Sequence, residues 1–155
     1  MEVQQDQFEK TVNTFIESLE NYFAKLTKTA AQTSPPFVKS QEQLELNDCT
    51  GMIGISGNKK GFVYISGDLD MFEELIKRYV GLKNPSTNNM LDMAGELANV
   101  VSGNVRETYG KDFMISVPVV FRGKPEQLKF PDDVPIYVIP IKWNGFDARM
   151  VVGIK

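Results

Sequence analysis

The sequence predicts an α+β fold in which helices pack on one face of a largely antiparallel sheet. The first observation is that the hydrophobic period changes along the chain in the order helix, strands, helix, helix, strands. The second is that two pairs of strand-like segments are joined by short glycine-containing turns, which is typical of hairpins. A chain of 155 residues with 42% hydrophobic content suits one domain, 1–155, with residues 1–36 as N-terminal helix and linker.

The N-terminal segment is expected to form an amphipathic helix over residues 5–30. Acidic residues gather in its first half and lysines at its end, as the helix dipole favours. Pro35 and Pro36 forbid its continuation, and the polar residues 37–47 are predicted to be extended. The apolar positions of the helix, which are typical of a face buried in the core, are Phe8, Val12, Phe15, Ile16, Leu19, Phe23 and Leu26.

Residues 51–68 have the pattern of a β-hairpin followed by the start of a helix. Two apolar strands, GMIGIS and GFVYISG, flank a turn at residues 57–60. This turn lacks the spacing of a phosphate-binding loop, and a strand follows it where such a loop requires a helix. Asp68 is positioned to cap a helix over residues 69–80, and Gly81 to end it.

Residues 88–109 predict a third helix, capped by Ser86 or Thr87 and closed by Gly110. One face is apolar and predicted to be buried, and it comprises Met90, Leu91, Ala94, Leu97, Ala98, Val101, Val105 and Thr108. At about 100° per residue, a second set is expected to gather on one exposed strip, and it comprises Gly95, Glu96, Asn99, Ser102, Gly103 and Arg106.

The remainder of the chain is predicted to add strands to the sheet. Residues 113–121 alternate as a strand, 123–133 form a loop, and 136–143 form another strand. Pro140 within that strand indicates an edge or a bulge. A two-residue turn at Asn144-Gly145 then leads into a last strand over residues 146–154.

Composition excludes several kinds of site. The chain has no histidine and one cysteine, so it offers no imidazole base, no Ser-His-Asp triad, no His- or Cys-based zinc site and no internal disulfide. Its 17 Lys and Arg residues form no basic block, so nucleic acid is not an expected partner. No run approaches the roughly 18 apolar residues that a membrane span requires. We therefore expect a cytoplasmic protein that does not bind membranes.

Glu96 and Asn99 are the candidate catalytic residues. They stand on adjacent turns of the predicted helix, with about 5–6 Å between their Cβ atoms. Gly95 and Gly103 flank them, and each interior glycine costs a helix about 1 kcal/mol relative to alanine. A face that another backbone approaches closely has a use for such glycines. On spacing alone, a solvated glutamate and an inert surface amide remain the alternative, and Ser102 and Arg106 receive no role.

The segment GELANVVSGN, residues 95–104, resembles the helix that marks the CheC–CheX–FliY family of chemotaxis phosphatases. That mark is commonly G-E-x-x-N-x-x-x-G, and every fixed position is filled. The hairpin 51–68 and the strand 115–120 are similar to segments that flank this helix in the family. The single motif copy resembles CheX more than CheC, and the length of the chain indicates no room for the extra domains of FliY-like members.

The resemblance implies hydrolysis of the aspartyl phosphate of a CheY-type response regulator. Asn99 would orient the attacking water, Glu96 would bind a lysine of the partner, and Gly95 and Gly103 would let the partner's loops come near. Mg²⁺ is expected in the regulator, with no metal or cofactor bound by this chain, and a homodimer is expected. Two alternatives stay open: a non-catalytic scaffold or sensor that binds a regulator, and a structural or ligand-binding domain with no regulator partner.

Overall fold

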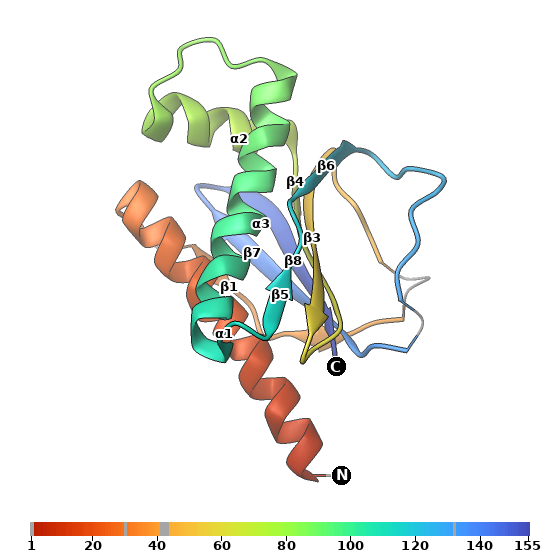
Figure 1. The fold of residues 1–155 in the computed structure, drawn as a ribbon. Coiled ribbons are helices and arrows are strands. Elements are labelled where there is room, and N and C mark those ends of the chain that lie inside the picture. The colour runs from red at the N-terminus through yellow and green to blue at the C-terminus, as the bar shows by residue number, and fades with distance from the viewer. Residues whose placement is uncertain (1, 30, 41–43, 132) are drawn as a thin grey trace.

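An antiparallel sheet of eight strands lies at the centre of this computed structural model, which describes residues 2–29, 31–40, 44–131 and 133–155 (Figure 1). The strands are ordered β1-β7-β8-β4-β3-β5, with β2 also paired to β7 and β6 also paired to β3. The predicted fold class is confirmed. The elements are α1 Glu2–Thr27, β1 Gln32–Thr33, β2 Phe37–Val38, β3 Cys49–Gly57, β4 Gly61–Gly67, α2 Leu69–Leu75, the π-helix η2 Ile76–Val80, α3 Thr87–Tyr109, β5 Phe113–Ile115, β6 Val119–Arg122, β7 Ile136–Trp143 and β8 Phe146–Ile154.

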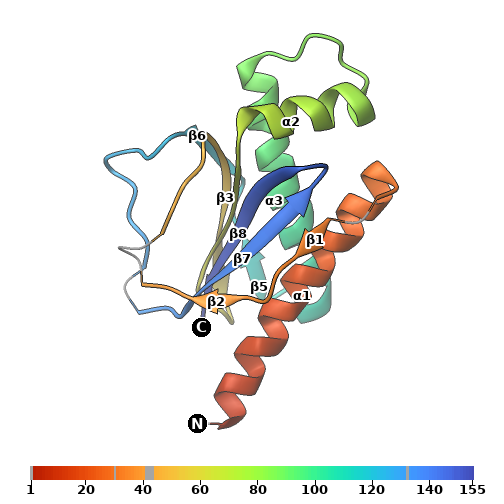
Figure 2. The ribbon, with the colours of Figure 1, turned by 180° about the vertical axis from the view of Figure 1, so that it is seen from behind.

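The helices α1 and α3 cover one face of the sheet, with α3 directly against β3 (Figures 1 and 2). A Cβ atom at Gly51 of β3 would lie 2.6 Å from the backbone nitrogen of Gly95, so the helix backbone rests on the strand backbone. The helices also bond to each other, since the Ser18 hydroxyl donates to the carbonyl oxygen of Val101 at 3.1 Å. The fully buried side chains of this layer include Phe15, Leu19, Phe23, Phe72, Leu97 and Val101.

Loop segments cover part of the opposite face of the sheet. Phe62 and Tyr64 of β4 belong to a second hydrophobic cluster with Leu44 and Val134, which lie outside the strands. The ring of Phe130 packs 4.8 Å from that of Phe62, centroid to centroid. Sequence periodicity did not predict this cluster, because Leu44, Val134 and Phe130, which close it over the strand residues, come from loops without a period of their own.

The N-terminal region differs from the prediction in two respects. The helix begins and ends three residues earlier than predicted, at Glu2–Thr27. Residues 28–36 are more than a linker, because Gln32 and Thr33 pair with Lys142 and Ile141 of β7. The parts of the predicted segments that fall on residues 30, 41–43 and 132 lie outside the described residues.

The helix after β4 begins and ends as predicted but is capped differently. Asp68 occupies the N-cap position, yet its side chain accepts no hydrogen bond from the helix. Its carboxylate instead accepts from the Asn47 amide at 3.2 Å, so the predicted cap is wrong. Gly81 ends the segment with φ 85°, as predicted for a left-handed C-cap.

The predicted single strand 113–121 is wrong, because it divides into β5 and β6. Both pair with β3, where Ile115 lies opposite Ile55 and Val119 opposite Met52. The three residues 116–118 therefore stand opposite only two residues of β3, 53 and 54. This is the count of a β-bulge. Ser116 bridges the interruption, because its backbone N–H donates to the Gly54 carbonyl at 2.9 Å and its hydroxyl accepts from the Gly54 N–H at 2.9 Å.

The last hairpin is confirmed. Asn144 and Gly145 have φ values of 50° and 80°, which a two-residue primed turn requires. The carbonyl of Pro140 accepts from the Ser34 N–H at 3.0 Å, so its ring nitrogen faces the gap between the short strands β1 and β2, where no ladder bond is lost. None of the helices formed by the described residues combines the length and apolar character that a bilayer span requires.

Candidate functional site

Helix α3 is a rigid platform fixed at both ends. Ser86 forms a capping box with Asn89, whose backbone N–H donates to the serine hydroxyl at 3.1 Å. At the other end, the Gly110 N–H donates to the Arg106 carbonyl at 2.8 Å. Because Leu97 and Val101 are fully buried, the rotation of the helix about its axis is also fixed. The opposite side of α3 therefore has a defined orientation towards solvent.

That solvent side carries an unbroken polar stripe. Asp92, Glu96 and Asn99 are exposed, and Gly103 is half-exposed one turn further on. Their spacing of four, three and four residues places them in a row along the helix. Neither Glu96 nor Asn99 makes a hydrogen bond or ion pair with any residue that the structure describes. A carboxylate and an amide are thus held side by side and left free for another molecule.

An apolar groove borders Glu96 between α1, η2 and α3, with a volume of about 330 Å³. Val80 and Leu82 stand at its edge and are 59% and 42% exposed. Tyr22 of α1 also lines it. Burial, and after it the negative charge of Glu96, raises the pKa of Tyr22, so the phenol stays neutral and can donate. The groove thus joins apolar surface to an acidic residue and a phenol.

Gly95 does not lie on the exposed strip as predicted, because it is buried against the protein's own chain. A Cβ atom there would lie 2.8 Å from Cγ1 of Val120 and 3.5 Å from Cβ of Pro118. The strand β6 and the bulge before it therefore occupy the space that was assigned to a partner. Ser102 is also buried, and its hydroxyl finds no partner within the described part of the chain.

Gly103 and Arg106 stand differently from Gly95. A Cβ atom at Gly103 would meet open space, so no contact within the described residues explains this glycine. Its role in the approach of a partner stays a prediction. Arg106 is exposed, and its Nε donates to the Phe113 carbonyl at 3.1 Å, which ties the helix to β5.

Sequence reasoning missed Asp92 and the apolar groove. Asp92 lies four residues before Glu96, so the same helical spacing that joined Glu96 to Asn99 could have found it. The exposure of Val80 and Leu82 has no comparable signal, because it depends on how α1 and η2 meet α3 in three dimensions.

The open antiparallel sheet with helices on one face matches the fold of CheX- and CheC-like chemotaxis proteins. The model of one family, described as "Chemotaxis phosphatase CheX", matches residues 49–142, which is more than half of the chain. The chain belongs to the CheX family. No curated protein matches it in sequence.

Solved structures of chemotaxis proteins share the fold. The CheX protein of Vibrio vulnificus is 24% identical, with a TM-score of 0.80 over 94% of this chain and 99% of its own. The CheX of Desulfovibrio desulfuricans is 20% identical, with a TM-score of 0.80 over 94% and 99%. The matching chain in a complex of CheX with CheY, BeF₃ and Mg²⁺ from Borrelia burgdorferi is 15% identical to this chain. Its TM-score is 0.72, over 93% of this chain and 97% of its own.

Proposed function

We propose that this protein accelerates hydrolysis of the aspartyl phosphate of a CheY-type response regulator, using Asn99 and Glu96. The observation that carries the proposal is the free pair on α3. In a member of a phosphatase family, an exposed carboxylate and amide on a rigid helix have no hydrogen-bond or ion-pair partner among the described residues. We assign the pair a role in another protein's site, because its side chains are exposed on a convex helix surface and make no bond within the described part of this chain.

Asn99 is assigned to the attacking water. An acyl phosphate has a good leaving group, so the remaining task is to hold water in line with phosphorus and stabilise the spreading charge. One planar carboxamide offers a donor and an acceptor, which orients a water molecule without taking its proton. The water oxygen bonds to phosphorus, the bond to the aspartyl oxygen breaks, and inorganic phosphate keeps the water's protons.

Glu96 is assigned to docking. A carboxylate at this position pairs with a lysine of the regulator and fixes the register of the two proteins. Asp92, one turn earlier on the stripe, adds a second negative charge and favours the same basic partner surface. The groove bordered by Glu96, Val80 and Leu82 then receives apolar side chains of that regulator, because it is continuous with the acidic stripe.

The metal is assigned to the partner. Mg²⁺ bound by the regulator neutralises phosphoryl oxygens, and a complex of CheX with CheY from Borrelia burgdorferi contains Mg²⁺. This chain is proposed to bind no metal or cofactor and to act in the cytoplasm with its regulator.

The protein is further proposed to be a homodimer. An unpaired sheet edge with apolar side chains is a surface on which a second chain can pair. The edge formed by β5 and β6 is of this kind, since Met114, Val117 and Val119 are 50%, 80% and 59% exposed. Sedimentation of the wild type and of Val117→Asp tests this, and a wild-type monomer at micromolar concentration would contradict it.

The decisive experiment measures phosphate release from a panel of phosphorylated response regulators. Wild-type protein should accelerate release from one of them, and Asn99→Ala should abolish the acceleration while binding is retained. Asn104→Ala is the matched control, because Asn104 is an exposed asparagine on the same helix, away from the stripe. An unchanged rate with Asn99→Ala, alongside retained binding, would favour the non-catalytic scaffold instead.

A further inference from the structure

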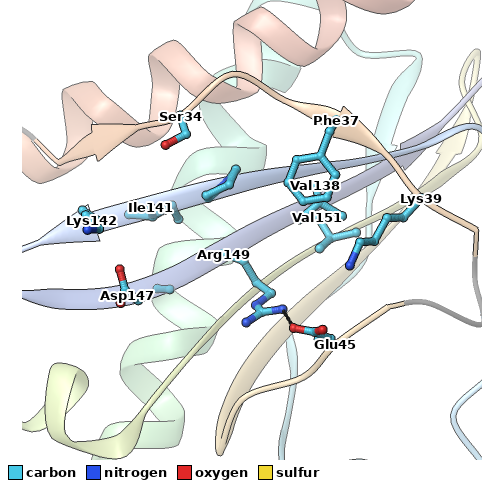
Figure 3. A pocket seen from close by; sticks show the side chains of 12 residues that line it. Ser34, Phe37, Lys39, Glu45, Val138, Ile141, Lys142, Asp147, Arg149 and Val151 are labelled. Atoms are coloured by element: carbon cyan, nitrogen blue, oxygen red, sulfur yellow. Dashed lines mark hydrogen bonds and ion pairs between the residues drawn. The ribbon is translucent and has the colours of Figure 1, made fainter.

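A second concave site lies on the face of the sheet opposite α1 and α3 (Figure 3). Strands β7 and β8 form its floor, and the chain from Ser34 to Lys39 passes above it, with Glu45 at one side. Its volume is about 270 Å³. Because it lies behind the sheet, it shares no residue with the stripe on α3 or with the groove beside it.

The floor combines apolar and cationic side chains. Val151 pairs with Val138 and Arg149 pairs with Pro140 across β7 and β8. The two-residue period of a strand puts Arg149 and Val151 on the same face. Phe37 pairs with Val138 across β2 and β7, and Figure 3 shows its ring beside this valine, with the guanidinium of Arg149 further off towards Glu45. The pocket therefore has an apolar part bounded by Phe37 and a charged part at Arg149.

Arg149 is only partly satisfied. Its Nη1 donates to a carboxylate oxygen of Glu45 at 2.6 Å, and this is the one ion pair that it forms with the residues placed in the structure. Its Nε is buried and has no partner among the described residues. A ligand oxygen cannot reach this enclosed nitrogen, but Nη2 of the same guanidinium is not buried and makes no hydrogen bond to a described residue, so it can donate to an acceptor in the pocket.

Lys39 adds a second cation at the same end. Figure 3 shows its amine end directed towards the Arg149–Glu45 pair. Its Nζ lies 5.6 Å from the centre of the Phe37 ring, and it forms no ion pair within the described part of the chain. The hydrogen bond from Arg149, and after it the charges of Arg149 and of Lys39, lower the pKa of Glu45. Counted over the described residues, this end of the pocket has a net charge of +1.

The other charged residues of the pocket cancel each other. Lys142 and Asp147 lie opposite each other across β7 and β8 at the far end of the floor. Since they carry opposite charges, they leave the excess positive charge at the Arg149 end unchanged. The pocket thus has one cationic end that is not fully neutralised and one apolar wall beside it.

We propose that this pocket binds a small organic anion, namely a carboxylate carried on a short apolar or aromatic group. The carboxylate accepts from Nη2 of Arg149 and from Nζ of Lys39, and the apolar group packs between Phe37, Val138 and Val151. A singly charged group matches the net +1 charge, whereas a dianionic phosphate would leave excess negative charge beside Glu45. The volume lies just below the roughly 300 Å³ at which pockets for drug-sized ligands begin, which fits a small molecule.

A titration with benzoate tests the charge and the apolar group together. Backbone amide NMR of the full chain should show saturable shifts centred on residues 37–39, 138 and 149–151. Benzamide has the same shape without the charge and should bind roughly tenfold more weakly or worse, as expected for loss of a charge-assisted hydrogen bond. Equal binding of the two probes, or no saturable shift with benzoate, would overturn the proposal, and tighter binding of inorganic phosphate would refute the monocarboxylate class.

Variants separate the pocket from general surface charge. Lys39→Met keeps the Arg149–Glu45 ion pair and should weaken benzoate binding roughly fivefold or more. Lys83→Met, an exposed lysine in the segment between η2 and α3, is the matched control and should bind benzoate as wild type does. Arg149→Met should abolish binding, but it leaves Glu45 unpaired, so its fold is checked by circular dichroism. Undiminished binding by Lys39→Met would contradict the assigned geometry.

Discussion

Replacement of Gly95 by alanine tests whether this glycine serves the protein's own packing. Alanine is favoured over glycine inside a helix by about 1 kcal/mol. Against that gain, the new Cβ would lie 2.8 Å from Cγ1 of Val120, closer than real carbon contacts come. Overpacking of this kind typically costs about 1–3 kcal/mol. We therefore expect Gly95→Ala to lower the free energy of unfolding by about 0–2 kcal/mol, measured by urea denaturation.

A double-mutant cycle isolates the contact. Val120→Ala removes the atom that the new methyl group meets, so in that background Gly95→Ala should raise the free energy of unfolding by about 1 kcal/mol. The difference between the two backgrounds is then the coupling between positions 95 and 120. If Gly95→Ala stabilises the protein equally in both backgrounds, Val120 does not limit the helix, and the structural reason given for this glycine is wrong.

Gly103→Ala should raise the free energy of unfolding by about 1 kcal/mol, because the added methyl group meets open space. If Gly103 lets the regulator come close to the helix, the same variant should also bind the regulator more weakly. Unchanged affinity for the regulator would exclude that role. Asn99→Ala should slow regulator dephosphorylation on the order of 10²-fold in single-turnover assays, and Asn104→Ala should not. Val80→Asp with Leu82→Ser should raise KM for the phosphorylated regulator while kcat is retained, whereas Val38→Asp, at a residue 67% exposed on β2, should change neither. Burial raises the pKa of the Cys49 thiol from 9.0 to about 12, so between these pH values the folded chain keeps a proton that the unfolded chain releases. The free energy of unfolding should therefore fall as pH rises from about 9 towards 12. A pH-independent free energy of unfolding in this range would contradict the burial of this thiol.

The predictions that succeeded depend on local chemistry. A few residues adjacent in sequence determine each of these features: the helical spacing in α1 and α3, the glycine-containing turns of the two hairpins, and the caps at Ser86, Gly81 and Gly110. The exposed, side-by-side placement of Glu96 and Asn99 follows for the same reason, since three residues of helix fix their relative position, whereas their catalytic role stays a prediction.

The predictions that failed depend on residues far apart in sequence. Gly95 follows helical spacing onto the edge of the polar strip, but Pro118 and Val120, at the strand next to β3, cover it. Ser116 interrupts an alternating pattern because its hydroxyl takes over a ladder bond from Gly54. Asp68 bonds to Asn47 instead of to its own helix. No pattern within a few neighbouring residues predicts any of these three contacts.

The contact of α3 with β3 at Gly51 has a consequence for how such a site survives mutation. Main-chain atoms meet there without an intervening layer of hydrophobic side chains, so the height of the helix above the sheet is set by groups that substitution does not alter. Exchanges among leucine, isoleucine and valine elsewhere in the core can change local packing, but they do not change the distance between the two backbones at this contact. Glu96, the residue after this contact, and Asn99, about one turn further along the same helix, therefore keep a position that substitutions elsewhere leave largely unchanged.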